Sequence, residues 1–76
     1  NILASTQVDV SHRFASPIAD RFAGIATHEG LGGVPLIDGC AAYFECRLEA
    51  VYPGGDHAVF IGRVERFAQT GLAPLP

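Results

Sequence analysis

The feature that most constrains this chain is a run of alternating residues over Cys40–Tyr52. Every even position of the run is apolar, and its charged residues all fall on odd positions. A period of two places alternate side chains on opposite faces of an extended strand. The turn-forming sequence Pro53–Asp56 follows, and His57–Phe67 has the apolar centre of a second strand. The sequence therefore predicts one long β-hairpin, and strands of this length are expected to curve or to carry a bulge.

The residues before the hairpin predict two short helices. The first spans Thr6–Ala15, with Ser5 or Thr6 as its N-cap, and it must end before Pro17 because the residue preceding a proline is pushed out of the helical region. Ser16 and Pro17 then suit the start of a second helix that ends near Gly24. The apolar face of this second helix would consist of Ile18, Phe22 and Ile25.

Residues 27–39 predict a loop, because they carry four of the nine glycines together with Pro35. The sequence Gly30–Gly33 is not a phosphate-binding loop, since no Lys-Ser/Thr pair follows it and it does not open a helix after a strand. We expect ordinary loop chemistry there, with His28 as a solvated loop histidine.

The two cysteines do not form a disulfide framework. Cys40 and Cys46 lie six positions apart on one predicted strand, which separates their Cα atoms by about 20 Å where a bridge requires less than ~7 Å. Their spacing is also wrong for zinc, and no other metal site is indicated. We expect two small apolar side chains on the buried face of the strand, and reduced thiols fit the cytoplasm.

Charge and composition exclude several classes of partner. The chain has eight acidic and five basic residues, a formal net charge of −3 and no basic cluster, which argues against nucleic acid and anionic membrane surfaces. No stretch approaches the ~20 apolar residues of a membrane span. The sequence contains no methionine and has apolar ends, so we expect residues 1–76 to belong to a longer protein.

No familiar catalytic motif is present. Asp56 and His57 are adjacent, and adjacent strand residues point to opposite faces, so we expect that Asp56 cannot orient His57. The structural interpretation is a turn aspartate followed by an edge-strand imidazole. Arg13 is by default a surface cation, and the alternative is a contact with an anionic phosphate.

Six segments, in this order, resemble the second half of the flavin reductase-like, FMN-binding split-barrel family, typified by the small reductase components of two-component aromatic monooxygenases. They are Asn1–Ala4, Val10–Ala15, Asp20–Gly24, Gly33–Ile37, Cys40–Ala50 and Gly55–Val64. The resemblance implies a mainly β fold with short helices, in which two short N-terminal helices and a long β-hairpin form part of a split β-barrel. Residues 1–76 would be the C-terminal portion of a single domain, without its N-terminal half and last strand.

The same resemblance implies an NAD(P)H-dependent flavin reductase that supplies reduced flavin to a partner monooxygenase. The cofactor would be FMN or FAD, the co-substrate NADH or NADPH, and the protein a homodimer with an oxygenase component as possible partner. The matching flavin-binding positions are Asn1, Leu3, Ser11, Arg13 and Phe14, with His12 replacing an arginine of the family pattern. The matching nicotinamide-binding positions are Gly55, Asp56 and His57. No side chain is expected to act as acid or base in the hydride step, because the chemistry belongs to the two nucleotides.

Two other function classes stay open. The first is a flavin-binding split barrel without reductase activity, and the second is a non-catalytic interaction domain in which Gly-Asp-His is only a hairpin turn. Independently of these alternatives, we expect the hairpin of an incomplete barrel to pack its apolar face against another polypeptide or a second copy, because nothing in the chain is large enough to cover it. That face consists of Phe44, Leu48, Phe60 and Val64.

Overall fold

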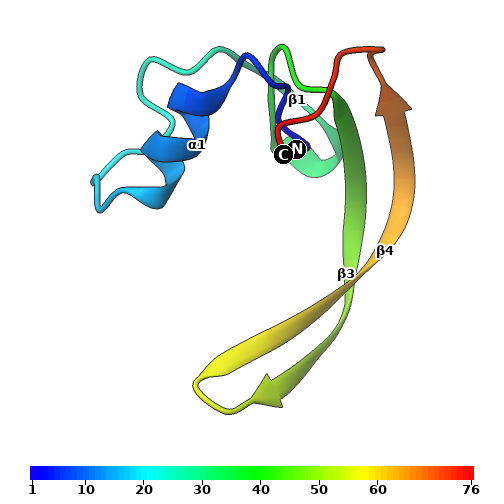
Figure 1. The fold of residues 1–76 in the computed structure, drawn as a ribbon. Coiled ribbons are helices and arrows are strands. Elements are labelled where there is room, and N and C mark those ends of the chain that lie inside the picture. The colour runs from blue at the N-terminus through cyan, green and yellow to red at the C-terminus, as the bar shows by residue number, and fades with distance from the viewer.

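A computed structural model describes all residues from Asn1 to Pro76. Its elements are α1 (Val8–Ala15), β1 (Thr27–Glu29), the 3₁₀ turn η1 (Leu31–Gly33), β2 (Pro35–Ile37), β3 (Ala42–Gly54) and β4 (His57–Gln69). The strands form two antiparallel two-stranded sheets, β1–β2 and β3–β4. Figure 1 shows α1 and the small sheet gathered at one end, with the long hairpin curving away from them. No helix is long and apolar enough to cross a bilayer.

The predicted hairpin is confirmed, with slightly shifted bounds. β3 begins at Ala42 rather than at Cys40, and it includes Pro53 and Gly54, so that Gly54 pairs with His57 across a connection of two residues. The first of these, Gly55, has φ 69°. A glycine at the first loop position with positive φ is the requirement of a type II′ turn, whose twist matches that of the flanking strands.

The expected irregularity is present as two register shifts, between Glu45 and Cys46 and between Leu48 and Ala50. Each shift leaves one residue unpaired, which bends a strand and increases its twist. The curvature of the hairpin in Figure 1 follows from them. Gly62 lies between the two shifts, and a Cβ there would lie 2.9 Å from the Cβ of Cys46, so the strands approach too closely for a side chain.

Helix α1 ends as predicted and begins later than predicted. Ser16 has φ −93° and ψ 151°, the extended conformation expected before a proline. The N-cap is Gln7, with no side-chain cap, so the prediction of Ser5 or Thr6 was wrong. The backbone N–H of Gln7 instead donates to the Ala4 carbonyl at 2.9 Å, and the Gln7 Oε1 accepts from the Ala4 N–H at 2.9 Å. This local turn occupies the residues that would have started the helix.

The predicted second helix is absent, and residues 16–25 form turns and bends. The Asp20 carboxylate accepts a hydrogen bond from the Phe22 N–H at 3.1 Å, and Arg21 Nε donates to the Ser16 carbonyl at 3.1 Å. Side chains that bind nearby backbone groups compete with helix formation. A helix of so few residues is marginal in water, so this competition is sufficient to prevent it.

The prediction of a loop over residues 27–39 was also wrong. β1 and β2 pair there, with Thr27 opposite Ile37 and Glu29 opposite Pro35. The glycines make the turn between them, because Gly32 and Gly33 have φ 65° and 81°, values that other residues rarely adopt. The glycines that indicated a loop therefore close a small hairpin.

The core is small and lies where the N-terminal segment, β2 and the start of β3 meet. Its buried residues are Ala4, Leu36, Ile37, Cys40, Ala41 and Glu45. Ile2 bridges Ala42 and Ala4 bridges Pro74, which holds the N-terminal segment between the start of β3 and the C-terminal residues.

The two cysteines are free, as predicted, but only Cys40 is buried and Cys46 is exposed. The expected burial of the even face of β3 was therefore wrong for Cys46. The even-face side chains Phe44 and Leu48 are likewise 52% and 61% exposed, because no element of this chain packs over them. The buried member of β3 is Glu45, at an odd position where the pattern indicates solvent.

Candidate functional site

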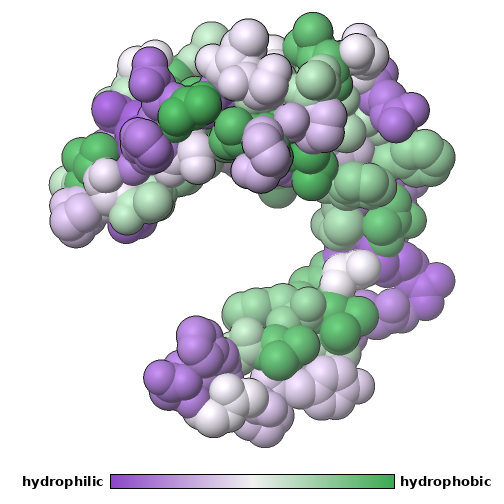
Figure 2. All heavy atoms as spheres, viewed as in Figure 1, coloured by the Kyte–Doolittle hydropathy of each residue, from purple (hydrophilic) through white to green (hydrophobic).

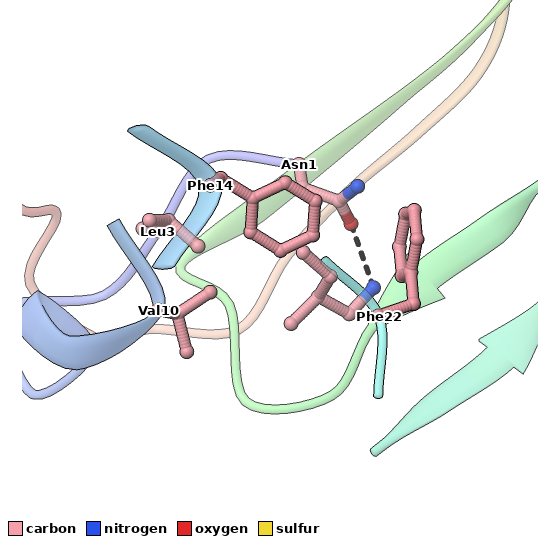
Figure 3. Close-up of a pocket in the computed structure, with 6 residues that line it drawn as sticks. Asn1, Leu3, Val10, Phe14 and Phe22 are labelled. Atoms are coloured by element: carbon pink, nitrogen blue, oxygen red, sulfur yellow. Dashed lines mark hydrogen bonds between the residues drawn. The ribbon is translucent and has the colours of Figure 1, made fainter. Parts of the chain in front are cut away.

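An apolar pocket of about 270 Å³ lies between the N-terminal segment, α1, the turn that follows it, and β2. It is lined by Asn1, Leu3, Val10, Phe14, Phe22 and Ile37. Figure 3 shows their side chains converging from these four segments. A concave site with mainly apolar and aromatic walls and one amide is typical of small-molecule and cofactor pockets.

Two aromatic rings form one wall of the pocket. Val10 and Phe14 lie one helical turn apart on α1, which places both on the same face. The ring of Phe22 meets that of Phe14 edge to face, with centroids 5.0 Å apart and planes at 82°. Phe22 therefore reaches the pocket from the irregular turn, not from the helix predicted for it.

Ile37, another lining residue, is held by hydrogen bonds to both its N–H and its carbonyl. The N–H of Ile37 donates to the Oδ1 of Asn1 at 2.8 Å, drawn as the dashed line in Figure 3. The carbonyl of Ile37 accepts from the hydroxyl of Tyr43 at 2.5 Å. The Nδ2 of Asn1 makes no hydrogen bond within the chain, so it remains a donor at the pocket.

The predicted flavin-side residues divide into two groups. Asn1, Leu3 and Phe14 line the pocket, whereas Ser11 and Arg13 do not. The Arg13 Nε donates to the Arg21 carbonyl at 2.9 Å and its Nη2 to the Asp20 carbonyl at 3.3 Å. Arg13 thus fixes the turn that carries Phe22, with part of its guanidinium still free to donate.

Sequence reasoning missed three of the lining residues. Val10 was recognisable from its helical spacing to Phe14. The spacing of Phe22 predicted a helix that does not form, and Ile37 carried no signal, because the pocket depends on where the turn and the small sheet fold back.

The predicted nicotinamide-side residues Gly55, Asp56 and His57 form the tip of the long hairpin. The sequence predicts that Asp56 cannot orient His57; the His57 Nε2 lies 3.4 Å from the Asp56 Oδ1, near it but without a hydrogen bond between the two side chains. Asp56 belongs to the turn and not to a strand, and strand alternation does not apply to it. The two side chains are 95% and 82% exposed, so water screens their attraction.

The tip and the pocket lie in different parts of the molecule. Figure 2 shows the far end of the hairpin as a separate arm with hydrophobic residues on it, across an open hollow from the rest. In Figure 1 the hairpin bends so that its tip comes round to the side of α1. Neither place contains a nucleophile with an adjacent base, the pair of groups on which covalent catalysis depends.

A charged cluster lies where β3 and β4 meet the η1 turn. The carboxylate of Glu45 accepts from Arg66 Nε at 2.5 Å and from Arg66 Nη2 at 2.8 Å. It also accepts from the Leu31 N–H at 2.8 Å. The hydrogen bonds from Arg66 and, to a lesser extent, from Leu31 lower the pKa of Glu45 from 4.5 to about 2, so the carboxylate stays ionised.

His28 lies beside this cluster, on β1 and not in a loop. Its Nδ1 lies 2.6 Å from the Asp38 Oδ1, and its ring meets the Tyr43 ring edge to face at 5.8 Å between centroids. His28 is therefore fixed by two neighbours although about half of its side chain is exposed.

Comparison with curated proteins gives consistent names. The chain is 48% identical, over 99% of its length, to the reductase component of the flavin-dependent trigonelline monooxygenase of Acinetobacter baylyi, of which it covers 24%. It is 44% identical over its whole length to HsaB, the reductase subunit of a flavin-dependent monooxygenase of Mycobacterium tuberculosis, of which it covers 41%. The chain thus spans between about a quarter and two fifths of these relatives.

Solved structures agree in fold. Component B of the nitrilotriacetate monooxygenase of Mycobacterium thermoresistibile matches with a TM-score of 0.86 at 41% identity, over 93% of this chain and 40% of that one. The NADH:FAD oxidoreductase SgcE6 of Streptomyces globisporus, in complex with NAD and FAD fragments, matches with a TM-score of 0.86 at 31% identity. That match covers 95% of this chain and 45% of SgcE6.

The family comparison covers nearly all of the chain. Residues 1–75 match the model of the flavin reductase like domain. That match includes both the pocket and the hairpin tip. The chain belongs to the flavin reductase like domain family.

Proposed function

We propose that the protein carrying this chain is an NADH-dependent flavin reductase that supplies reduced flavin to a partner monooxygenase. The observation that carries the proposal is the apolar pocket, which is built from Asn1, Leu3 and Phe14, three of the positions that match flavin-binding segments of the family. The names of the relatives, reductase components of flavin-dependent monooxygenases, support the reaction.

We infer that the pocket takes the ring system of a flavin, FMN or FAD. Phe14 and Phe22 offer aromatic surface, and aromatic rings favour stacked or edge contacts with other flat rings. The Nδ2 of Asn1 is free to donate to a ring carbonyl or nitrogen. Arg13 has unused N–H groups close by, and Ser11 lies on the same helix, so both remain candidates for the flavin phosphate.

The hairpin tip is the proposed place of the nicotinamide nucleotide. Gly55 makes the turn, Asp56 lies against His57, and His57 presents an imidazole that can hydrogen-bond to or stack on a ring. Two relatives are named for NADH, the FMN reductase AsuE2 and the oxidoreductase SgcE6.

A bound flavin supplies the ring that accepts a hydride, and the reduced nicotinamide supplies that hydride. The residues of this chain bind and orient the two ligands and exclude water from the pocket. Orientation of two reactants is itself a large contribution to rate, which is why no acid or base is required among the lining residues.

The exposed apolar side chains of the hairpin support a homodimer. Phe44, Leu48, Phe60 and Val64 are each at least half exposed, which is unusual for a strand that faces only water. The oxygenase component is a second proposed partner. The free thiols of Cys40 and Cys46 agree with a reducing compartment such as the cytoplasm.

Titration of the full-length protein with FMN and FAD, followed by flavin fluorescence, tests the binding step. NADH oxidation with free flavin tests the reaction. Phe14→Ala should weaken flavin binding about tenfold or more, because it removes one aromatic wall. Val8→Ala, on the same helix but outside the pocket, is the matched control.

The outcomes separate the candidate functions. Flavin binding together with NADH oxidation supports the reductase. Bound flavin that NADH does not reduce indicates a flavin-binding module without reductase activity. No flavin binding at all contradicts the proposal and favours an interaction domain.

A further inference from the structure

Two neighbouring side chains of β3 reach across to the small β1–β2 sheet. Tyr43 and Glu45 are two positions apart, so they share one face of the strand. The Tyr43 hydroxyl donates to the Ile37 carbonyl, where β2 ends, at 2.5 Å. The Glu45 carboxylate accepts from the Leu31 N–H, at the turn between β1 and β2, at 2.8 Å. The small sheet is thus held at both of its ends by one strand.

A buried glutamate is an unusual anchor for a small sheet. It is the buried charged residue of the chain, at 6% exposure, and Arg66 neutralises it with two hydrogen bonds. Removing a carboxylate from water is costly unless every acceptor site is used well. Here the two oxygens of Glu45 accept three hydrogen bonds, two from Arg66 and one from the backbone N–H of Leu31 in the η1 turn.

The fit between Glu45 and the turn is tight. A Cβ on Gly30 would collide with the Glu45 Oε1, and it would lie 3.1 Å from the Cγ of Leu36. The backbone of Gly30, with φ −98°, suits any residue. A side chain at this position would therefore have to displace the Glu45 carboxylate from its place against the η1 turn.

The small sheet carries one wall of the pocket. Ile37 is 5% exposed and lines the pocket, and its N–H holds the side chain of Asn1, which lines it too. The sheet has only three residue pairs, so its own hydrogen bonds do little to fix its orientation. Its position relative to α1 depends on the contacts that anchor it from outside.

We propose that Tyr43 and Glu45 are positioning residues of the flavin pocket, which they shape by fixing both ends of the β1–β2 sheet and thereby placing Ile37 and Asn1. The inference rests on the proposed flavin reductase function. It assigns the two residues no contact with the flavin itself. Their effect passes through the peptide of Ile37 and the amide of Asn1.

The test uses the full-length protein with the substitutions Tyr43→Phe, Glu45→Ala and Glu45→Gln. Glu65→Gln is the matched control, because it removes a carboxylate from an exposed pair on the neighbouring strand, 3.1 Å from Arg47. Four quantities are measured: the flavin Kd, the absorption spectrum of bound flavin, the KM for NADH, and hydrogen exchange of the Leu31 amide.

We expect Tyr43→Phe and Glu45→Ala each to raise the flavin Kd by roughly three- to tenfold, the effect of one lost hydrogen bond. The spectrum of bound flavin should shift and the KM for NADH should stay unchanged. Glu45→Gln keeps an oxygen acceptor for the Leu31 N–H, so it should recover most of the affinity and the protection of that amide. The control should match the wild type in all four measurements.

Gly30→Ala disturbs the contact between Glu45 and the η1 turn from the side of the turn, because the added Cβ displaces the carboxylate while Glu45 and Arg66 are not substituted. It should reproduce the effect of Glu45→Ala on the flavin Kd, and it keeps the test valid if Glu45→Ala fails to fold. Folded variants with wild-type flavin affinity and an unchanged spectrum would overturn the positioning role while leaving the reductase function intact. A wild-type protein that binds no flavin would overturn both.

Discussion

The edge-to-face contact between Phe14 and Phe22, with ring centroids 5.0 Å apart, joins helix α1 to a segment without regular structure. The segment has no helical hydrogen-bond ladder to hold it. Its place depends on this aromatic contact and on the bonds from Arg13 to the carbonyls of Asp20 and Arg21. One wall of the pocket is therefore only as stable as these few interactions.

Phe22→Ala should weaken flavin binding by about tenfold, since an aromatic pair is worth roughly 0.5–1.5 kcal/mol beyond the area it buries. Fluorescence titration of the full-length protein measures this. Ile18→Ala is the control, because Ile18 is similarly exposed, at 38% against 41%, and lies in the same segment but does not line the pocket. An equal loss in both variants would mean that the segment as a whole matters and not the ring.

Arg13→Ala tests whether the guanidinium reaches a phosphate. Loss of one charge-assisted hydrogen bond costs about 1.5–3 kcal/mol, or roughly ten- to a hundredfold in Kd. Riboflavin lacks the phosphate of FMN, so the variant should lose its affinity for FMN while its affinity for riboflavin changes little. Equal losses for the two ligands would show that Arg13 acts through the turn that it holds.

His57→Ala should raise the KM for NADH at least several-fold and leave the flavin Kd nearly unchanged, because His57 lies at the hairpin tip and outside the flavin pocket. Steady-state kinetics at saturating flavin give the first quantity and titration the second. Glu49→Gln, elsewhere on the hairpin, should alter neither. Unchanged kinetics in His57→Ala would leave His57 as an ordinary turn residue.

The low pKa of Glu45 predicts a stability that depends on pH. The pKa is lowered from 4.5 to about 2 in the folded chain, chiefly by Arg66, so the ionised carboxylate favours the folded state. That contribution is complete above pH 4.5 and is lost as the pH falls towards 2. Denaturant unfolding of the wild type and Glu45→Gln should therefore differ most above pH 4.5 and converge near pH 2. A difference that is constant between pH 2 and 7 would contradict the ion pair.

Phe60→Lys tests the proposed dimer. Phe60 is 66% exposed, and a charge there should oppose burial of the hairpin against a second copy. Sedimentation velocity of the full-length protein should show a shift from dimer towards monomer. Gln69→Lys adds the same charge at an exposed polar position of β4 and should leave the association unchanged.

The sequence by itself determined the elements whose interactions are local. The alternation before Pro53 and the Gly55–Asp56 turn were enough for the long hairpin, because a period of two and a two-residue turn specify pairing between neighbours. The end of α1 before Pro17 followed from the stereochemistry of one dipeptide. The resemblance to the family rested on such segments in their order along the chain.

Tertiary structure decided what depends on contacts between distant residues. The bond from Ile37 to Asn1 spans 36 positions and that from Leu31 to Glu45 spans 14, and neither has a signal in the neighbouring sequence. Alternation gave Glu45 a solvent-facing position, yet the fold of the β1–β2 sheet over that face buries it. The pocket wall at Ile37 and the buried charge at Glu45 exist only because the small sheet packs where it does, and hydrophobic period and turn chemistry carry no information about such packing.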